Sequence, residues 1–485
     1  MMKKGFTAVV LSLMSIFFLT LGLTNSVKAA KVYQIGTDVT YPPFEFANDQ
    51  NKYVGIDIDL MNAVAKEEGF KVNIKPIGFN AAVQSLESGQ IDGVMSGMAI
   101  TPVRQQTFDF SKPYYKTGVI IAVAKNSKIK SFKQLRGKKV ALKTGTAAAA
   151  YAQSIQSKYG FKTVTFDDSD TMYNDVVNGN SVACFEDYPV MQYAIKTGLK
   201  LKIATKPAQS GYYGFAVMKG KNQVLLQKFD RGLVKLKKNG TYQKIVNKYL
   251  DTAATKKERK DNSSAKAANH TFWGLLQQNR GALFKGLAKT VQLTVLGIIC
   301  ATIFGVLLGL LGVVPHKTAQ GIAATIIYIF RGLPLLVLAL FIYNGLPSLT
   351  GVKISAFNAG IITLMLNEGA YTAAFVKGGI EAVDPGQMEA ARSLGLPFSK
   401  AMRRIILPQG IKIMIPSFIN QFIITLKDTS ILSIIGILEL TQTGKIIIAR
   451  NLEGFRIWTI IAVIYLLLIT LLTLLSKMVE RRIKG

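Results

Sequence analysis

The chain has 485 residues, of which 49% are hydrophobic, and its formal net charge is +31. This length allows two or three domains, and the mean hydropathy of +0.28 indicates that part of the chain lies in lipid. The basic residues are spread along the chain and form no nucleic-acid recognition module, so the charge favours an anionic membrane environment over nucleic acid. With only two cysteines, a disulfide-stapled fold is excluded.

The first 30 residues have the pattern of a secretory signal. Lys3 and Lys4 precede an apolar run over residues 6–23, and a small-residue cleavage site ends at Ala29. The apolar run is long for a signal peptide, so an uncleaved membrane anchor is the alternative. In both cases we expect the segment that follows to lie outside the cytoplasm.

Residues 31–250 have the pattern of a soluble α/β domain. Strands are expected over 32–36, 91–95, 119–123, 139–142 and 182–185, and helices over 59–68 and 81–89. The alternation of strands and helices predicts a parallel sheet with helices on its faces.

Several motifs in this domain resemble the polar amino-acid substrate-binding proteins of ABC importers. They are Gly36-Thr37-Asp38, Tyr41-Pro42-Pro43-Phe44, Gly55-Ile56-Asp57-Ile58-Asp59-Leu60, Ser96-Gly97 with Thr101 and Arg104, and Phe108-Asp109-Phe110-Ser111. The resemblance implies a two-lobed α/β fold of the periplasmic-binding-protein type II, whose lobes close on a ligand. Lobe one is expected over 31–115 and 212–250, lobe two over 118–206, and the crossing strands near 115–119 and 206–213.

An amino-acid ligand presents a carboxylate and an ammonium group, so its site needs a positive donor and an acceptor in a cleft that excludes water. Arg104 is the candidate for the carboxylate, because a guanidinium group offers two parallel donors. Backbone N–H groups near Gly97 and Thr146 would complete the anion site. For the ammonium, the resemblance favours Asp187 over Asp38.

The resemblance also implies that Tyr41 and Phe79 enclose the carbon chain of the ligand, with ordinary core packing as the alternative for Phe79. Lys143 occupies a position where the glutamine binders of the family carry Lys and the basic amino-acid binders carry an apolar residue. An ammonium there disfavours cationic ligands, and Glu186 could accept from an amide, so together they would recognise a neutral carboxamide. The alternative is that Lys143 and Glu186 pair with each other. The expected ligand-binding residues are Asp38, Tyr41, Phe79, Ser96, Gly97, Arg104, Lys143, Thr146, Glu186 and Asp187.

Residues 251–270 lack apolar periodicity and are expected to form a flexible linker. The domain that follows, over 271–485, is expected to be an all-α permease. Its first stretch, 272–289, is amphipathic and is expected along the outer membrane surface or as an extension of the first span. Five spans are predicted over 290–314, 320–343, 356–376, 411–437 and 457–476. This odd number puts the C-terminus in the cytoplasm, in agreement with the basic residues that then fall on that side.

The polar segment EAARSLGLPFSKAMRRIILP at 389–408 resembles the EAA loop of MetI-like ABC importer permeases. In that family the loop, here 381–408, docks on a separate ATPase subunit. The two alanines would let a helix seat closely, Gly395 would allow a sharp turn, and Pro408 is expected to stop the helix. A plain basic loop would need no such spacing. The expected coupling residues are Glu389, Ala390, Ala391, Gly395, Leu407 and Pro408.

The sequence contains no P-loop motif, no zinc-type Cys/His spacing and no nucleophile elbow. We therefore expect a transporter subunit that is no enzyme, has no cofactor or metal site, and uses ATP hydrolysed by a partner subunit. The prediction is a fused binding and permease subunit of an ABC amino-acid importer in the cytoplasmic membrane, with the binding domain extracellular, a homodimer as the assembly and glutamine as the favoured ligand. Alternative ligands are glutamate, asparagine or basic amino acids. A ligand-gated channel and a transmembrane amino-acid sensor are the alternatives from other classes. The EAA-like loop and the five-span count disfavour the channel, and the sensor is disfavoured because no kinase-like or cyclase-like segment follows the last predicted span.

Overall fold

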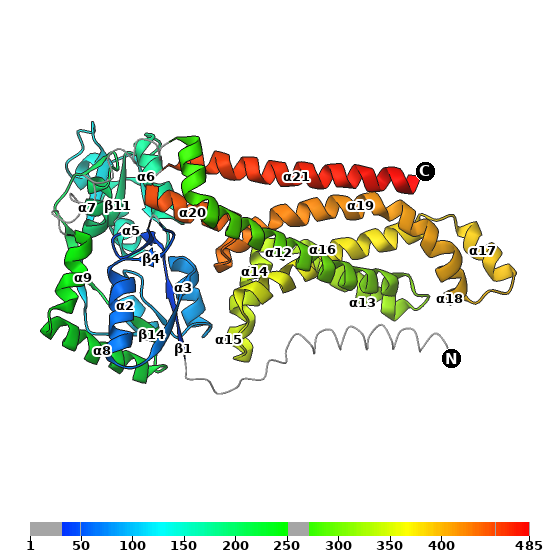
Figure 1. Ribbon diagram of the computed structural model, residues 1–485, viewed down its shortest axis with the longest axis horizontal. Coiled ribbons are helices and arrows are strands. Elements are labelled where there is room, and N and C mark those ends of the chain that lie inside the picture. The colour runs from blue at the N-terminus through cyan, green and yellow to red at the C-terminus, as the bar shows by residue number, and fades with distance from the viewer. Residues whose placement is uncertain (1–31, 49, 251–270, 452, 485) are drawn as a thin grey trace.

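The computed structural model describes residues 32–48, 50–250, 271–451 and 453–484. An α/β part with two lobes adjoins an elongated helical part (Figure 1). The predicted signal segment and the predicted linker lie outside the described residues.

Lobe one is built on a five-stranded sheet with the order β5-β1-β6-β14-β7. The strands are β1 (Val32–Thr37), β5 (Lys71–Pro76), β6 (Gly93–Val94), β7 (Phe108–Phe110) and β14 (Ala216–Met218). A small separate sheet contains β2 (Thr40–Tyr41), β3 (Glu45–Ala47) and β4 (Tyr53–Val54). The helices are α2 (Ile56–Glu67), α3 (Phe79–Glu87), α4 (Pro102–Thr107), α8 (Gln223–Lys238) and α9 (Thr241–Leu250). Apolar side chains of α2, α8 and β1, such as Leu60, Phe229 and Ile35, are completely buried and form the core.

Lobe two contains a sheet with the order β10-β9-β11-β8-β12, and β13 pairs with β8 outside this path. The strands are β8 (Tyr115–Ala124), β9 (Lys139–Lys143), β10 (Lys162–Phe166), β11 (Ala183–Asp187), β12 (Leu201–Ile203) and β13 (Ala208–Tyr213). The helices are α5 (Ala147–Tyr159), α6 (Ser169–Val177) and α7 (Tyr188–Lys196).

The strands β8 and β13 connect the lobes and pair in antiparallel fashion, from Ala208 opposite Val119 to Tyr213 opposite Tyr115. The prediction of a parallel sheet is correct for β1 with β5 and for β9 with β10. It is wrong for β8, which is antiparallel to β11 and β12. The reason is that β8 enters lobe two from lobe one and no single crossover helix joins it to β11 or β12, so the connections impose no parallel direction on it.

The helical part begins with α12 (Phe272–Val313), a continuous helix of 42 residues. The stretch 272–289 is therefore helical and continuous with the first apolar segment, as the predicted extension of the first span requires, and its location along the membrane surface stays a prediction. The later helices are α13 (Lys317–Gly332), α14 (Leu335–Leu340), α15 (Leu346–Thr350), α16 (Ala356–Glu381), α17 (Pro385–Ser393), α18 (Phe398–Ala401), α19 (Leu407–Asp428), α20 (Leu440–Asn451) and α21 (Gly454–Lys484).

Within the described ranges, four helical segments are long and apolar enough to cross a membrane: Phe272–Val313, Ala356–Glu381, Phe398–Ile435 and Gly454–Met478. The pair Lys317–Gly332 and Leu335–Thr350 makes a fifth if it counts as one span, but it bends by 101°. The break falls at Pro334, whose ring and missing N–H are incompatible with a helix interior. The predicted second span is therefore a broken one.

α12 and α16 pack closely because glycines leave room for the facing backbone. A Cβ atom on Gly305 would lie 2.5 Å from Thr372 Cβ, and one on Gly309 would lie 2.6 Å from Val376 Cβ. Small residues at such positions allow membrane helices to gain van der Waals contact over a long interface.

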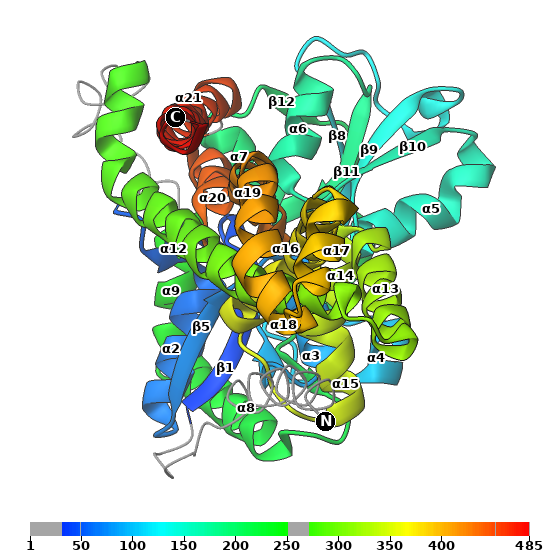
Figure 2. The ribbon, with the colours of Figure 1, turned by 90° about the vertical axis from the view of Figure 1, so that its right-hand side faces the viewer.

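α17 and α18 lie at the end of the helical part that is remote from the lobes, and they face the viewer in Figure 2. The prediction that Pro408 stops the helix is wrong, because the helical segment Phe398–Ile435 continues through it. A π-helical turn, Met402–Ile406, precedes α19 and places Pro408 in the first turn of that helix. The hydrogen-bond pattern changes from the π-helical to the α-helical spacing at this turn, and such a site can accommodate the missing N–H of a proline.

Candidate ligand-binding site

A cavity lies between the two lobes. Its lining residues are Asp38, Tyr41, Glu45, Phe79, Ser96, Gly97, Ala99, Arg104, Lys143, Thr146, Ala147 and Asp187. The predicted ligand residues therefore converge on one place, with Glu186 as the exception. Among the described residues there is no cluster of His, Cys, Asp and Glu side chains that could hold a metal ion.

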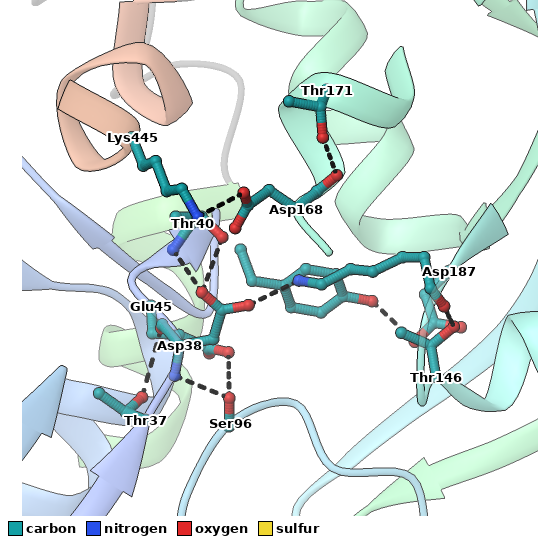
Figure 3. Close-up of polar contacts among 12 residues, drawn as sticks. Thr37, Asp38, Thr40, Glu45, Ser96, Thr146, Asp168, Thr171, Asp187 and Lys445 are labelled. Atoms are coloured by element: carbon teal, nitrogen blue, oxygen red, sulfur yellow. Dashed lines mark hydrogen bonds and ion pairs between the residues drawn. The ribbon is translucent and has the colours of Figure 1, made fainter. Parts of the chain in front are cut away.

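An ion pair crosses the cavity from one lobe to the other. Lys143, at the end of β9, places its Nζ atom 2.6 Å from Oδ2 of Asp38, which follows β1. The Oδ1 atom of Asp38 accepts hydrogen bonds from the backbone N–H and the hydroxyl of Thr40, at 2.9 and 2.7 Å (Figure 3). Burial alone would raise the pKa of Asp38, but Lys143 and these hydrogen bonds outweigh it and the pKa is lowered. Asp38 is therefore a carboxylate held by fixed partners.

Glu186 lies behind the cavity and is held by three donors of the protein itself. Oε1 accepts from the hydroxyl of Tyr41 at 3.1 Å and from the Asp187 N–H at 2.9 Å. Oε2 accepts from the hydroxyl of Tyr173 at 2.6 Å. Burial, and secondarily the charge of Asp187, raises the pKa of Glu186 to about 7. The ion pair of Lys143 is thus with Asp38, and the alternative pairing of Lys143 with Glu186 is wrong.

Asp187 is presented to the cavity by two tyrosines. Its Oδ2 atom accepts a hydrogen bond from the hydroxyl of Tyr213 and lies 3.0 Å from the hydroxyl of Tyr41, whose single proton is shared between Asp187 and Glu186. Asp187 is buried at the end of β11, and Tyr213 at the end of β13. A carboxylate fixed in this way offers an acceptor for an ammonium group. Burial of an ammonium group without such a partner would be costly.

Arg104 also lines the cavity and bridges the two lobes. It sits on α4, and its two terminal nitrogens donate to the carbonyl oxygens of Ala99, at 2.8 Å, and Gly145, at 2.9 Å. Its guanidinium carbon lies 5.3 Å from the centre of the Phe79 ring. The guanidinium plane is thereby oriented before a ligand binds, which reduces the entropy cost of binding a carboxylate.

Thr146 caps the N-terminus of α5, a helix of 13 residues. Its hydroxyl accepts from the Ala149 N–H at 3.1 Å and donates to the Lys143 carbonyl at 2.8 Å. The first N–H groups of α5, beginning at Ala147, border the cavity and have no partner within the helix. Together with Arg104 they can bind an anionic group.

Sequence reasoning missed Glu45, which lies at the base of the cavity. Ser96 accepts from the Asp38 N–H at 2.9 Å and donates to Oε1 of Glu45 at 3.0 Å. Burial, and next the neighbouring Asp57, raises the pKa of Glu45 well above its usual value. A signal was present: an acidic residue directly follows the apolar Tyr41–Phe44 motif, and in the small sheet Glu45 stands opposite Tyr41.

The predicted coupling residues occupy the remote end of the helical part. Glu389 and Ala390 are exposed on α17, whereas Ala391 is buried against its neighbours. Gly395 follows α17 with φ of +80°, a left-handed conformation that favours glycine. Leu407 and Pro408 begin α19. The exposed face of α17 is available to a partner.

Two family models match the chain and together cover most of it. Residues 33–252 match the bacterial extracellular solute-binding proteins, family 3. Residues 297–485 match the binding-protein-dependent transport system inner membrane component. These matches confirm the predicted fold class, a periplasmic-binding-protein-like α/β domain of type II joined to a helical permease domain.

Individual relatives correspond to each part of the chain. Over 213 residues it is 35% identical to the glutamine transport system permease protein GlnP of Escherichia coli (strain K12), covering 44% of this chain and 97% of that protein. Over 231 residues it is 33% identical to the ABC transporter arginine-binding protein 1 of the same organism, covering 47% of this chain and 94% of that protein. The solved substrate-binding domain 2 of Lactococcus lactis GlnP, in an open conformation, is 46% identical, with a TM-score of 0.37, covering 47% of this chain and 98% of that domain. The chain therefore belongs to the amino-acid ABC importers, as a transporter component, not an enzyme, in which a solute-binding domain is fused to a permease domain.

Proposed function

We propose that this chain binds glutamine in the cleft between its lobes and imports it through its own permease domain. The observation that carries the proposal is the ion pair between Lys143 and Asp38, which lines the cavity. An ammonium can donate to the carbonyl oxygen of a carboxamide, and a carboxylate can accept from its NH2 group. Asp38 takes the acceptor role that sequence reasoning gave to Glu186, because Asp38 lines the cavity and Glu186 does not.

The charges around the cavity support a ligand with a neutral side chain. Arg104 would bind the α-carboxylate, together with the N–H groups of α5 and Gly97, and Asp187 would bind the α-ammonium. Tyr41 and Phe79 would enclose the carbon chain. The remaining pair, Lys143 and Asp38, has no net charge, so an additional ligand charge would be left without a counter-charge in a buried site.

The names of the relatives support both glutamine and a second candidate. One relative is a glutamine permease, whereas the arginine-binding protein 1 and the arginine transport system permease protein ArtQ of Bacillus subtilis, 34% identical over 203 residues, are arginine components. Arginine is therefore the alternative ligand. Its guanidinium group would have to displace Lys143 from Asp38, and this cost favours glutamine.

For transport we propose that the lobes lie outside the cell and that α17 faces the cytoplasm, where it docks on an ATPase subunit. The lobes and α17 lie at opposite ends of the helical part, as this arrangement requires (Figure 1). Exposed Glu389 and Ala390 would contact the ATPase. Two copies of the chain would form the transport unit, with the EAA-like segment of each copy engaging one ATPase.

Calorimetric titration of the purified full chain in lipid nanodiscs against the twenty amino acids tests the proposed ligand. We expect glutamine to bind most tightly, with asparagine and glutamate weaker and arginine and lysine weakest. Tight binding of arginine would overturn the glutamine proposal and would require Lys143 to leave the cavity. Binding of no amino acid would overturn the assignment of the cleft itself.

A further inference from the structure

α20 lies against both lobes of the binding domain at the edge of the cavity. Ile446 packs into a small apolar cluster with Val39 and Ala47, both almost completely buried in lobe one. The preceding residue, Lys445, places its Nζ atom 3.6 Å from Oδ2 of Asp168, at the start of α6 in lobe two. Two consecutive residues of one permease helix therefore contact two different lobes.

The contact with lobe two lies next to the ligand site. Figure 3 shows Lys445 joined to Asp168, with Asp38 and Thr40 of lobe one directly beside them. Lys445 and Asp168 are both partly buried, with side chains 27% and 21% exposed. Burial raises the pKa of Asp168, and the ammonium of Lys445 opposes that rise. The pair therefore forms at the point where the two lobes and the permease meet.

Lobe one has further contacts with the permease that do not involve the cleft. The side chain of Gln90 donates to the carbonyl of Tyr343 at 2.6 Å and accepts from the Ile354 N–H at 3.2 Å. Asn344 donates to the side chain of Gln84 at 3.0 Å. These bonds join α3 and the loop after it to the region around α15, and they can persist when lobe two moves. These contacts therefore attach lobe one to the permease independently of the position of lobe two.

We propose that α20 is the surface by which the permease distinguishes the closed binding domain from the open one, with the Lys445–Asp168 pair as a contact made on closure. The proposal rests on the proposed function, in which an amino acid closes the lobes. Rotation of lobe two away from lobe one would carry α6, and Asp168 with it, away from Lys445, while Ile446 would stay in its cluster. The closed state would then gain an ion pair with the permease that the open state lacks.

Because ligand binding and lobe closure are thermodynamically linked, the preference of α20 for the closed lobes can be measured as a change in ligand affinity. A contact that favours the closed state of the lobes must tighten binding of any ligand that needs this state. A partly exposed ion pair is worth up to about 1 kcal/mol, which corresponds to roughly fivefold in affinity. We therefore expect Lys445→Met to weaken glutamine binding by the full chain in nanodiscs about fivefold. Gln84→Ala, which removes a contact of lobe one, is the matched control and should leave the affinity unchanged.

A double-mutant cycle separates this coupling from a direct effect on the site. If the pair acts as proposed, Asp168→Asn weakens binding in the wild-type chain but adds nothing to Lys445→Met, and the charge exchange Lys445→Asp with Asp168→Lys restores part of the affinity. Equal affinities for the wild-type chain and Lys445→Met would overturn the proposal. So would independent, additive effects of the two single variants.

Hydrogen exchange of α20 gives a readout that does not depend on which amino acid is the substrate. Addition of glutamine or arginine, whichever the chain binds, should slow exchange at α20 in the wild-type chain and much less in Lys445→Met. Unchanged exchange at α20 despite calorimetric binding would overturn the role of α20 and leave the ligand site intact. Binding of neither amino acid would overturn the proposed function, and the role of α20 with it.

Discussion

The Nζ atom of Lys143 and the Oδ2 atom of Asp38 lie 2.6 Å apart, and they belong to different lobes. Both side chains are almost completely buried, so each charge depends on the other. The same contact can hold the lobes together and present a donor and an acceptor to a carboxamide. Under the proposed function, ligand recognition and lobe closure would therefore be linked in one pair of residues.

Replacement of Lys143 by methionine should weaken glutamine binding by about 1.5–3 kcal/mol, or roughly ten- to a hundredfold, because a hydrogen bond from a charged donor is lost. It also leaves Asp38 buried without a cation, which should lower the thermal stability. The double variant with Asp38→Asn should be more stable than the sum of the single effects predicts. Calorimetric binding and unfolding curves measure both quantities, and strictly additive stabilities would show that the ion pair is unimportant.

Arg104→Ala should weaken binding of every amino acid alike, by roughly tenfold or more, because the α-carboxylate is common to all of them. Arg104→Lys is the matched control: it keeps the charge but cannot reach the carbonyls of Ala99 and Gly145 at once, so we expect an intermediate loss. The ratio of the affinities for glutamine and asparagine should stay constant in both variants. A change in that ratio would place Arg104 at the side-chain end of the ligand.

The motifs of the binding domain were sufficient to predict which residues converge on the cavity, because each motif ends a strand or begins a helix at the same edge of a lobe. They were insufficient to predict the partners of Lys143. Asp38 and Glu186 lie on different lobes, and which of them meets Lys143 depends on the rotation between the lobes. Glu45 was missed for a related reason, since the shift of its pKa is a consequence of complete burial, which depends on the tertiary fold.

In the helical part, hydropathy predicted the apolar segments. It did not predict where these segments bend or where they continue into the neighbouring helices. The amphipathic start of α12 was assigned to the membrane surface, and helical periodicity could not decide between a separate helix and a longer one. The sharp break at Pro334 was visible as a proline within an apolar run. The continuation of the helix through Pro408 was not visible in the sequence, because this continuation depends on the π-helical turn that precedes Pro408.

Burial of Glu186 makes a specific prediction for the pH dependence of stability. Its pKa of about 7 in the folded chain exceeds the ordinary value of 4.5, so the folded state holds a proton that the unfolded state releases between these pH values. The contribution of Glu186 to stability is therefore fully present below about pH 4.5 and falls by about 3 kcal/mol as the pH rises to 7. Glu186→Gln should remove this decrease and stabilise the binding domain at pH 8 relative to the wild type.

Thermal unfolding of the full chain between pH 5 and pH 8 measures this effect. Asp38→Asn is a control of opposite sign. The pKa of Asp38 is lowered in the folded state, so its contribution is present above the ordinary pKa and is lost as the pH falls. A Glu186→Gln variant whose stability parallels that of the wild type over the whole range would show that Glu186 is ionised when folded.

Gly395→Val should reduce uptake at least tenfold while leaving ligand binding unchanged. Gly395 has φ of +80°, and a β-branched residue there would distort the turn after α17. Gly395→Asn is the matched control, because asparagine tolerates the left-handed conformation and should preserve most of the uptake. Proteoliposomes containing the chain and its ATPase report uptake of labelled glutamine, and calorimetry reports binding. Normal uptake by Gly395→Val would show that this turn does not couple the permease to the ATPase.

The orientation of the chain in the membrane can be tested with two single cysteines. We expect a cysteine at Ser263, before α12, to react with an impermeant thiol reagent added to intact cells, and a cysteine at Ser399, on α18, to react only after the cells are opened. Both expectations follow from an odd number of spans between the two positions and from lobes outside the cell. The wild-type chain is the control, since Cys184 is buried and Cys300 lies within the first apolar segment. Labelling of Ser399→Cys in intact cells, with none of Ser263→Cys, would reverse the orientation and place α17 out of reach of a cytoplasmic ATPase.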